Sequence, residues 1–178
     1  MRLEADSVLP FPRERVFRTY RDDLAKLVPF LPNVREIEIK ERVDDGPVVR
    51  FFNVWVGGGE IPAAARVVLS ESMLSWDDHA EWDERTWVCK WDIATHAFPG
   101  AVSCKGENRF IELGPERTRL EIRGDLVIDL KRVRAVPSFL AGSLGRTVEQ
   151  FLAGHISQNL TSVSEGLRKY MEDLTQPT

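Results

Sequence analysis

The spacing of apolar residues along this chain changes twice, near residue 34 and again near Pro137. These two changes constrain the fold more than any other feature of the sequence. From residue 34 to residue 130 they alternate with polar residues, as in half-buried antiparallel strands. From Pro137 to Leu174 they recur at helical spacing, with no further proline before Pro177. A coiled coil is one interpretation of that last segment. A helix that covers the apolar face of the preceding sheet is the simpler one.

The segment before residue 34 predicts a short strand and then helical structure. Arg2–Leu9 alternates like a strand and ends at two prolines. Pro12 suits the first turn of a helix, where its missing N–H would have no partner in any case. Helical spacing then continues to Pro29, which predicts one helix or two short helices that meet near Asp22–Asp23.

Turn sequences divide the alternating region into strands. The DDGP turn makes Val34–Val56 a hairpin, in which we expect Ile37, Ile39 and Val43 on the buried face. The other expected strands are Ala64–Met73, the short aromatic-acidic piece SWDDHAEWDE, Thr86–His96, Val102–Leu113 and Arg117–Leu130. The expected inward faces of the last segments hold Trp87, Cys89, Trp91, Ile93 and Thr95, and then Leu120, Ile122, Leu126 and Ile128.

Three consecutive glycines in FFNVWVGGGEIP raise the question of a phosphate-binding loop. Such a loop needs a Lys-Ser/Thr pair and a following helix, and a dinucleotide fingerprint needs a different glycine spacing. Here Glu60 and then a strand-like segment follow the glycines. We therefore interpret them as a turn, which is compatible with a mobile loop at the mouth of a pocket.

Composition limits the class of protein. The 178 residues suit a single domain over 1–178, with an ordered core of about 2–174. The 24 basic and 28 acidic residues give no general attraction to nucleic acid or anionic membranes. The N-terminus MRLEADSVLP lacks the pattern of a secretory signal, and no apolar segment is long enough to span a bilayer. We predict a cytoplasmic protein with no integral membrane association.

The two cysteines, Cys89 and Cys104, are fifteen residues apart. In the predicted compartment they would be reduced thiols, with a disulfide as the alternative. No Cys or His stands at metal-ligand spacing from His79, His96 or His155. We predict neither a metal site nor a cofactor.

The order of the expected elements resembles that of the START-like or SRPBCC superfamily, also described as the helix-grip or birch-pollen-allergen fold. The resemblance covers nearly the whole chain and rests on LPFPRERVFRTYRDDLAKLVPFLPNVREIEI and VPSFLAGSLGRTVEQFLAGHISQNL. In the first segment, Val16 and Phe17 match the family's opening helix. The resemblance implies an α+β fold, with a curved antiparallel sheet of about seven strands, two short helices after the first strand and a long C-terminal helix.

The resemblance also implies an elongated apolar cavity between the sheet and the last helix. Members of the superfamily carry lipids, sterols or polyketides there, and some act as cyclases or dehydratases. A dry, filled core is the alternative for each aromatic residue. By the resemblance, the lining residues would be Phe51, Trp55, Trp87, Trp91, Phe110, Leu120 and Ile122 from the sheet, with Phe151, His155 and Asn159 from the helix. Strand parity adds Asn53 and Asn108 as hydrogen-bonding groups on the apolar face.

Two charged segments have a functional and a solvated interpretation. The acidic run in SWDDHAEWDE could bind a cation or supply paired carboxylates, but we favour a solvated hairpin. The basic residues Lys131, Arg132 and Arg134 could steer an anionic head group, and we again favour solvated side chains.

These observations lead to three functional hypotheses. We prefer binding, carriage or sensing of a lipid or other hydrophobic small molecule to catalysis. The first alternative is a cyclase or dehydratase that uses the same cavity, with His155 as the general acid or base and Arg50 as the group that polarises a carbonyl. The second is a protein-interaction module with a closed core. A homodimer through the sheet edges remains open.

Overall fold

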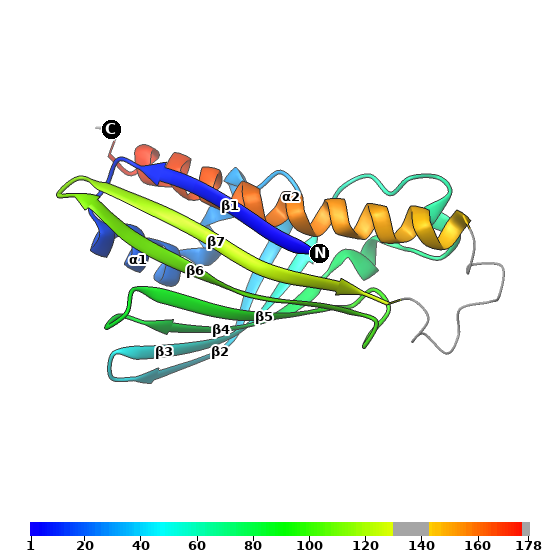
Figure 1. The fold of residues 1–178 in the computed structure, drawn as a ribbon, viewed down its shortest axis with the longest axis horizontal. Coiled ribbons are helices and arrows are strands. Elements are labelled where there is room, and N and C mark those ends of the chain that lie inside the picture. The colour runs from blue at the N-terminus through cyan, green and yellow to red at the C-terminus, as the bar shows by residue number, and fades with distance from the viewer. Residues whose placement is uncertain (130–142, 176–178) are drawn as a thin grey trace.

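The computed structural model describes residues 1–129 and 143–175. Its centre is a seven-stranded antiparallel sheet with the order β1-β7-β6-β5-β4-β3-β2. The long helix α2 (Ser143–Asp173) lies across one face of the curved sheet (Figure 1) and contacts β1 and β7. The strands are β1 (Arg2–Leu9), β2 (Val34–Asp45), β3 (Val48–Gly57), β4 (Trp76–Asp83), β5 (Val88–Thr95), β6 (Val102–Gly114) and β7 (Arg117–Ile128). The predicted α+β class and the order of elements are confirmed.

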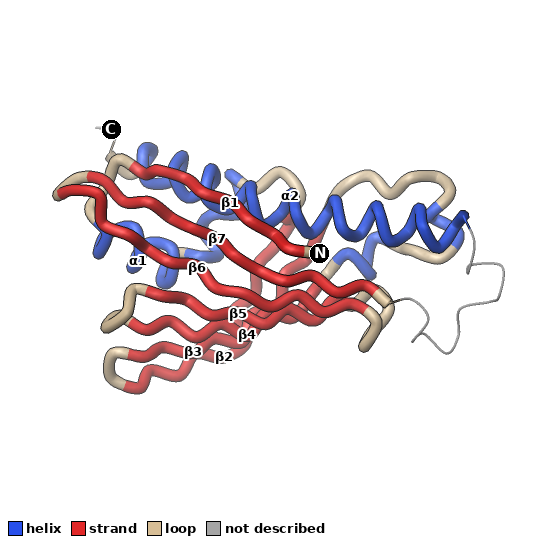
Figure 2. Tube along the Cα trace, viewed as in Figure 1, coloured by secondary structure: helices blue, strands red, loops and turns tan. Residues whose placement is uncertain are grey.

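Two short helices follow β1, as predicted. Helix α1 (Arg13–Asp22) begins directly after Pro12, and the 3₁₀ helix η1 (Leu24–Phe30) follows it after the single residue Asp23 (Figure 2). The N–H of Asp23 donates to the carbonyl of Thr19, which ends α1. The inner side of α1 buries Val16, Phe17 and Tyr20 against the sheet, so this pair of helices closes one end of the core.

The prediction of a strand over Ala64–Met73 is wrong. This segment holds two 3₁₀ helices, η2 (Ala65–Val67) and η3 (Glu71–Leu74). Pro62 begins the first of them, because its carbonyl accepts hydrogen bonds from the N–H groups of both Ala65 and Arg66. Ala65 and Leu69, four residues apart, are buried. The segment covers the core beside α2 and adds no strand to the sheet.

The acidic segment SWDDHAEWDE forms β4, the first strand of the β4–β5 hairpin, so the expected strand is present and the solvated interpretation of its charged residues fails only at Asp78. Strand β4 pairs with β3 on one side and with β5 on the other. Its residues alternate, with Asp78, Ala80 and Trp82 buried on the inner face. His79 lies on the outer face, where its ring stacks on Phe52 at 4.7 Å. The charge of the segment concealed only the inward direction of Asp78.

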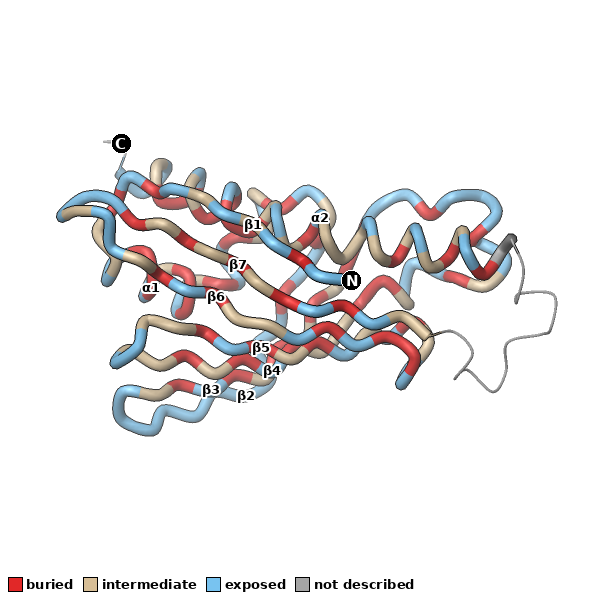
Figure 3. The backbone as a smooth tube through the Cα atoms, in the orientation of Figure 1, coloured by how far each residue is buried: buried red, intermediate tan, exposed pale blue. Residues whose placement is uncertain are grey.

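The predicted buried face of β2 extends only to Ile37. Ile39 is 40% exposed and Val43 is 45% exposed. Strand β2 is an edge strand, and its pairing with β3 shifts register between Ile39 and Glu41. The tip of the β2–β3 hairpin accordingly lies beyond the covered part of the sheet, as the pale blue tube in Figure 3 shows.

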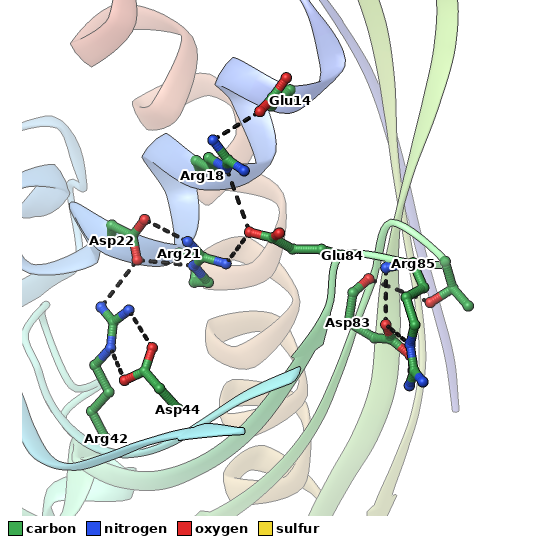
Figure 4. A network of polar contacts seen from close by, with 10 residues as sticks. Glu14, Arg18, Arg21, Asp22, Arg42, Asp44, Asp83, Glu84 and Arg85 are labelled. Carbon is green, nitrogen blue, oxygen red and sulfur yellow. Dashed lines mark hydrogen bonds and ion pairs between the residues drawn. The ribbon is translucent and has the colours of Figure 1, made fainter. Parts of the chain in front are cut away.

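A network of ion pairs ties α1 to the hairpin ends of the sheet (Figure 4). The Arg21 side chain is only 9% exposed and donates to Asp22 at 2.8 Å and to Glu84, in the β4–β5 turn, at 2.6 Å. Asp22 also accepts from Arg42 of β2, which pairs with Asp44. The guanidinium groups of Arg21 and Arg42 together link α1, β2 and the β4–β5 turn.

Replacement of Arg21 with Ala is expected to lower the free energy of unfolding by about 2 kcal/mol, because charged hydrogen-bond partners in a half-buried site are left unpaired. Urea denaturation measures the loss. Arg18→Ala is the matched control, since Arg18 lies on the same helix and also pairs with Glu84, but its side chain is 51% exposed. The free energy of unfolding should fall less in the control than in Arg21→Ala. Equal losses in the two variants would contradict the role of the buried guanidinium.

Candidate ligand-binding cavity

A cavity lies between the inner face of the sheet and α2. Its volume is about 80 Å³. Helix α2 presents one face to the cavity through residues spaced three and four apart. The cavity is lined by Tyr20, Leu24, Asn53, Trp55, Met73, Leu74, Ser75, Trp76, Asp78, Ala80, Trp82, Cys89, Trp91, Ile93, Thr95, Ala97, Asn108, Leu152, His155, Ile156, Asn159, Leu160 and Val163. The lining is thus mainly apolar, with a few polar groups.

Strand register places a carboxyl and an amide side by side on the sheet wall. Asn53 of β3 is paired with Asp78 of β4, and both side chains are buried. The Nδ2 of Asn53 donates to Oδ2 of Asp78 at 3.1 Å, and the Nε1 of Trp55 donates to the same oxygen at 3.3 Å. Two neutral donors therefore hold one oxygen of the carboxyl in a fixed direction.

Burial raises the pKa of the Asp78 carboxyl, and the two hydrogen bonds only partly oppose this effect. No arginine or lysine forms an ion pair with Asp78 among the described residues. The environment therefore favours the protonated form, and a protonated carboxyl donates a hydrogen bond as well as accepting one. Asp78 is a potential donor at an otherwise apolar wall.

The helix wall carries His155 and Asn159, one turn apart. Burial lowers the pKa of His155, which favours the neutral imidazole. Within residues 1–129 and 143–175, Nε2 of His155 and the Oδ1 atoms of Asn53 and Asn159 have no hydrogen-bond partner. Buried polar atoms of this kind are rare, and each is available to a ligand or to water.

The triple glycine packs beside His155. Gly59 has a φ of +121°, and a Cβ at this position would lie 3.4 Å from Cε1 of the imidazole. The N–H of Gly58 donates to the carbonyl of Asn33. A turn follows β3 here, as predicted, and no helix follows it that could hold a phosphate. The close approach places this turn at the helix side of the cavity.

A second set of hydrogen-bonded side chains lies at another part of the cavity wall. The indole Nε1 of Trp91 donates to Oδ1 of Asn108 at 2.9 Å, and Nδ2 of Asn108 donates to the hydroxyl of Tyr20 at 3.4 Å. Burial raises the pKa of Tyr20, so its hydroxyl stays protonated. These three side chains come from β5, β6 and α1, and each satisfies another inside the apolar core.

The structure brings together only part of the residue set expected from the sequence. Asn53, Trp55, Trp91, Asn108, His155 and Asn159 line the cavity. The remaining expected residues, Phe51, Trp87, Phe110, Leu120, Ile122 and Phe151, are not among its lining residues. Of these, Phe151 stacks on His155 at 5.6 Å and so supports a lining residue from behind. The others belong to the packed core or its rim.

Trp87 shows why strand parity failed at one position. Its φ of +58° places it in a left-handed turn before β5, which breaks the alternation. Its ring instead packs edge-on against Phe17 at 5.3 Å, with the guanidinium of Arg13 4.6 Å from the ring centre. Phe110 packs on the same Phe17 at 5.0 Å. These aromatic rings close the end of the core beneath α1.

Arg50 does not reach the cavity. It lies on the outer face of β3, half exposed, and pairs with Glu81 at 2.8 Å. The role of a carbonyl-polarising group expected for Arg50 is therefore excluded by its direction. The basic residues Lys131, Arg132 and Arg134 lie outside the described residues.

Asp78 and Tyr20 also line the cavity, although neither was predicted to do so from the sequence. The signal for Asp78 was present in its parity, because it alternates with Ala80 and Trp82 on one face of β4. Tyr20 lies within the helical spacing that ends at Pro29, but only the packing of α1 shows that its hydroxyl reaches Asn108.

Cys89 and Cys104 are both free and buried. Burial raises the pKa of Cys104 to about 12, so this thiol is not a nucleophile at neutral pH. Across the described ranges, no group of three or more His, Cys, Asp or Glu side chains is arranged to hold a metal ion. Neither α2 nor any other helix in the described residues combines the length and the apolar character needed to cross a membrane.

Replacement of Asp78 with Asn is expected to raise the free energy of unfolding at neutral pH. Because burial raises the folded-state pKa above the ordinary value of 3.8, stability is lost as the pH rises from 3.8 through the raised pKa. Asn accepts the same two hydrogen bonds and does not ionise. Urea denaturation at several pH values should show a difference between variant and wild type that narrows as the pH falls towards 3.8. A difference independent of pH would contradict a buried carboxyl.

Solved structures with the same architecture provide the comparison with known proteins. The protein TTHA0849 from Thermus thermophilus superposes with a TM-score of 0.65 at 22% identity, over 99% of this chain and 100% of its own. The Zhui aromatase/cyclase from Streptomyces sp. gives a TM-score of 0.57 at 17% identity, over 96% of this chain and 95% of its own. A START superfamily protein from Mycobacterium smegmatis gives 0.54 at 14% identity, over 98% and 99% of the two chains.

No protein-family model matches the chain, and no curated protein matches its sequence. At these identities the likeness to solved structures establishes the fold alone. The curved seven-stranded antiparallel sheet, the paired short helices and the long covering helix agree with it throughout. The chain has the START-like, helix-grip fold.

Proposed function

We propose that this protein binds a small, largely apolar molecule with a polar head in the cavity between the sheet and α2. The observation that carries the proposal is the set of buried polar atoms without protein partners on both walls: Oδ1 of Asn53, and Oδ1 of Asn159 with Nε2 of His155. A ligand that hydrogen-bonds to them removes the cost of burying them unpaired. Asp78 and Asn53 would then hold the head from the sheet, and His155 and Asn159 from the helix.

The available space favours a compact ligand. A cavity of about 80 Å³ holds a few water molecules or a small ring, and is smaller than the several hundred cubic ångströms typical of sites for larger ligands. Among the ligands considered for this fold, a small ring compound fits better than a sterol or a long-chain lipid. Carriage of the larger molecules would need α2 or the η2–η3 segment to move.

The chemistry of the head follows from the lining. Asn53 and Asn159 offer acceptor oxygens, and a protonated Asp78 offers a donor. A neutral hydroxyl group accepts from Asp78 and donates to an amide oxygen, whereas an anion would meet no cation among the described lining residues. A neutral hydroxylated compound is thus the favoured class.

Acid–base catalysis, as in a cyclase or dehydratase, is a second candidate. It is favoured by one pair of groups on opposite walls, the carboxyl of Asp78 with its raised pKa and the imidazole of His155 with its lowered pKa. When two pKa values are shifted in opposite directions in this way, a protonated acid and a neutral base can be present at the same pH. In a dehydration, neutral His155 would take a proton from carbon while Asp78 protonated the departing hydroxyl. The closed-core interaction module is the least favoured, because a cavity remains in the core.

The proposal includes a cytoplasmic location and pairing of two copies into a homodimer. A cytoplasmic location would keep the buried thiols of Cys89 and Cys104 reduced, as they are in the structure. The two sheet edges, β1 and β2, are the strands through which a homodimer would pair.

Native mass spectrometry of the purified protein, followed by denaturing extraction, tests the binding proposal. Wild-type protein should retain a small molecule in stoichiometric amount. Ala80→Leu, which fills the cavity, should lose it, while the matched control Ala94→Leu on the outward face of β5 should keep it. If a hydroxylated compound is then added to the protein, release of a molecule lighter than that compound by one water would favour the dehydratase.

Absence of a bound molecule would contradict the proposal. If no mass is bound and no thermal shift occurs across phenols, short fatty acids, sterols and aromatic polyketides, the cavity does not accept small molecules. That outcome would remove both the binding and the catalytic candidates and favour the interaction module.

A further inference from the structure

One row of inward-facing residues across the sheet has an unusual composition. Trp91 of β5 is paired with Ala80 of β4 on one side and with Gly106 of β6 on the other. Gly106 is paired in turn with Gly124 of β7. The row therefore places one of the largest side chains between three of the smallest.

The indole of Trp91 lies over the two glycines. A Cβ built on Gly106 would lie 2.4 Å from Cζ2 of Trp91, and one built on Gly124 would lie 2.5 Å from Cη2. Real Cβ atoms do not approach other atoms so closely. At Gly124 the ring thus occupies the space that a side chain would otherwise fill, and at Gly106 it does so together with the carbonyl oxygen of Arg123, 2.2 Å from the built Cβ.

Hydrogen bonding fixes the ring in that place. The indole N–H donates to Oδ1 of Asn108 on β6, and Asn108 is held by the hydroxyl of Tyr20. Trp91 is only 7% exposed, yet it lines the cavity. Its ring is therefore a wall of the cavity on the side of β6 and β7.

We propose that Trp91 sets the length of ligand that the cavity accepts, by filling the space above Gly106 and Gly124. This inference rests on the proposed function, since it concerns the ligand of the same cavity. With the indole present, the cavity takes a compact hydroxylated ring. Truncation at position 91 would join the cavity to the volume above bare backbone, and would admit an apolar extension directed towards β7.

The physical basis is that neither Gly106 nor Gly124 carries a side chain, so the next side chain along the row is that of Leu3 on β1. When a large side chain is removed from an ordinary core, neighbouring side chains relax into part of the space. Here the two glycines have no side chains that could do so. Apolar space that stays empty takes up small apolar molecules.

A series of 4-alkylphenols, from 4-methylphenol to 4-hexylphenol, tests the inference by isothermal titration calorimetry. In the wild-type protein, affinity should fall beyond a short alkyl chain. In Trp91→Ala the decrease in affinity should begin at a longer alkyl chain. The shortest homologue that binds weakly to the wild type should bind about tenfold more tightly to the variant, as expected for about two further buried methylene groups. Binding of 4-methylphenol should change much less.

Two further variants define the comparison. Trp87→Ala removes the same side chain at a position outside the lining residues and should keep the wild-type length limit. Gly124→Ala should displace the indole into the cavity and shorten the limit. If Trp91→Ala does not fold, as judged by circular dichroism, Trp91→Phe replaces it and should move the limit in the same direction by a smaller amount.

An identical length limit in wild type and in the folded Trp91 variant would overturn the inference and leave the proposed function intact. A Trp87→Ala limit that moves as far as that of the Trp91 variant would also overturn it, because the effect would then follow from lost stability. Absence of binding of every homologue to every variant would overturn the proposed function together with the inference.

Discussion

A single helix is too narrow to cover the inner face of this sheet. Strands lie about 4.8 Å apart, whereas a helix with its side chains is about 10 Å wide, so α2 alone spans about two of the seven strands. Curvature of the sheet and the short segments α1, η1, η2 and η3 cover the remainder. Where these covers meet, large side chains from the sheet must fill the gap. The cavity is the space that they leave.

The residues that fill this gap also decide what the cavity can do. Trp82, Phe110 and Phe17 pack ring against ring and close the end beneath α1. Towards the middle, the inner face carries Asn53 and Asp78 in place of apolar residues. A packed core would gain nothing from a carboxyl whose ionised form is disfavoured by burial. A site that receives a hydroxylated ligand gains a donor and an acceptor held at a known place by Trp55 and Asn53.

Periodicity was sufficient to predict the class of fold, but not the contents of the cavity. The helical stripe of α2 and the alternation of β7 predicted a helix and a strand correctly because both run for many residues with one buried face. The strand predicted over Ala64–Met73 failed because alanines next to Pro62 form short helices as readily as strands. Asp78 was overlooked because its charge was judged before its parity, and Trp87 was misplaced because a left-handed residue reverses the parity that precedes it. Which inward residues meet a cavity depends on the crossing of α2 over the sheet, and no local pattern encodes that crossing.

The protonation state of Asp78 is the central claim of this account, because the donor on the sheet wall depends on it. Carbon-13 NMR of the Asp78 carboxyl, assigned with Asp78→Asn and followed as a function of pH, measures it directly. The account predicts a pKa clearly above the ordinary value of 3.8, with the carboxyl surrounded by the unchanged amide of Asn53 and indole of Trp55. A pKa at or below 3.8 would mean that burial does not favour the protonated carboxyl, and would contradict the donor on the sheet wall.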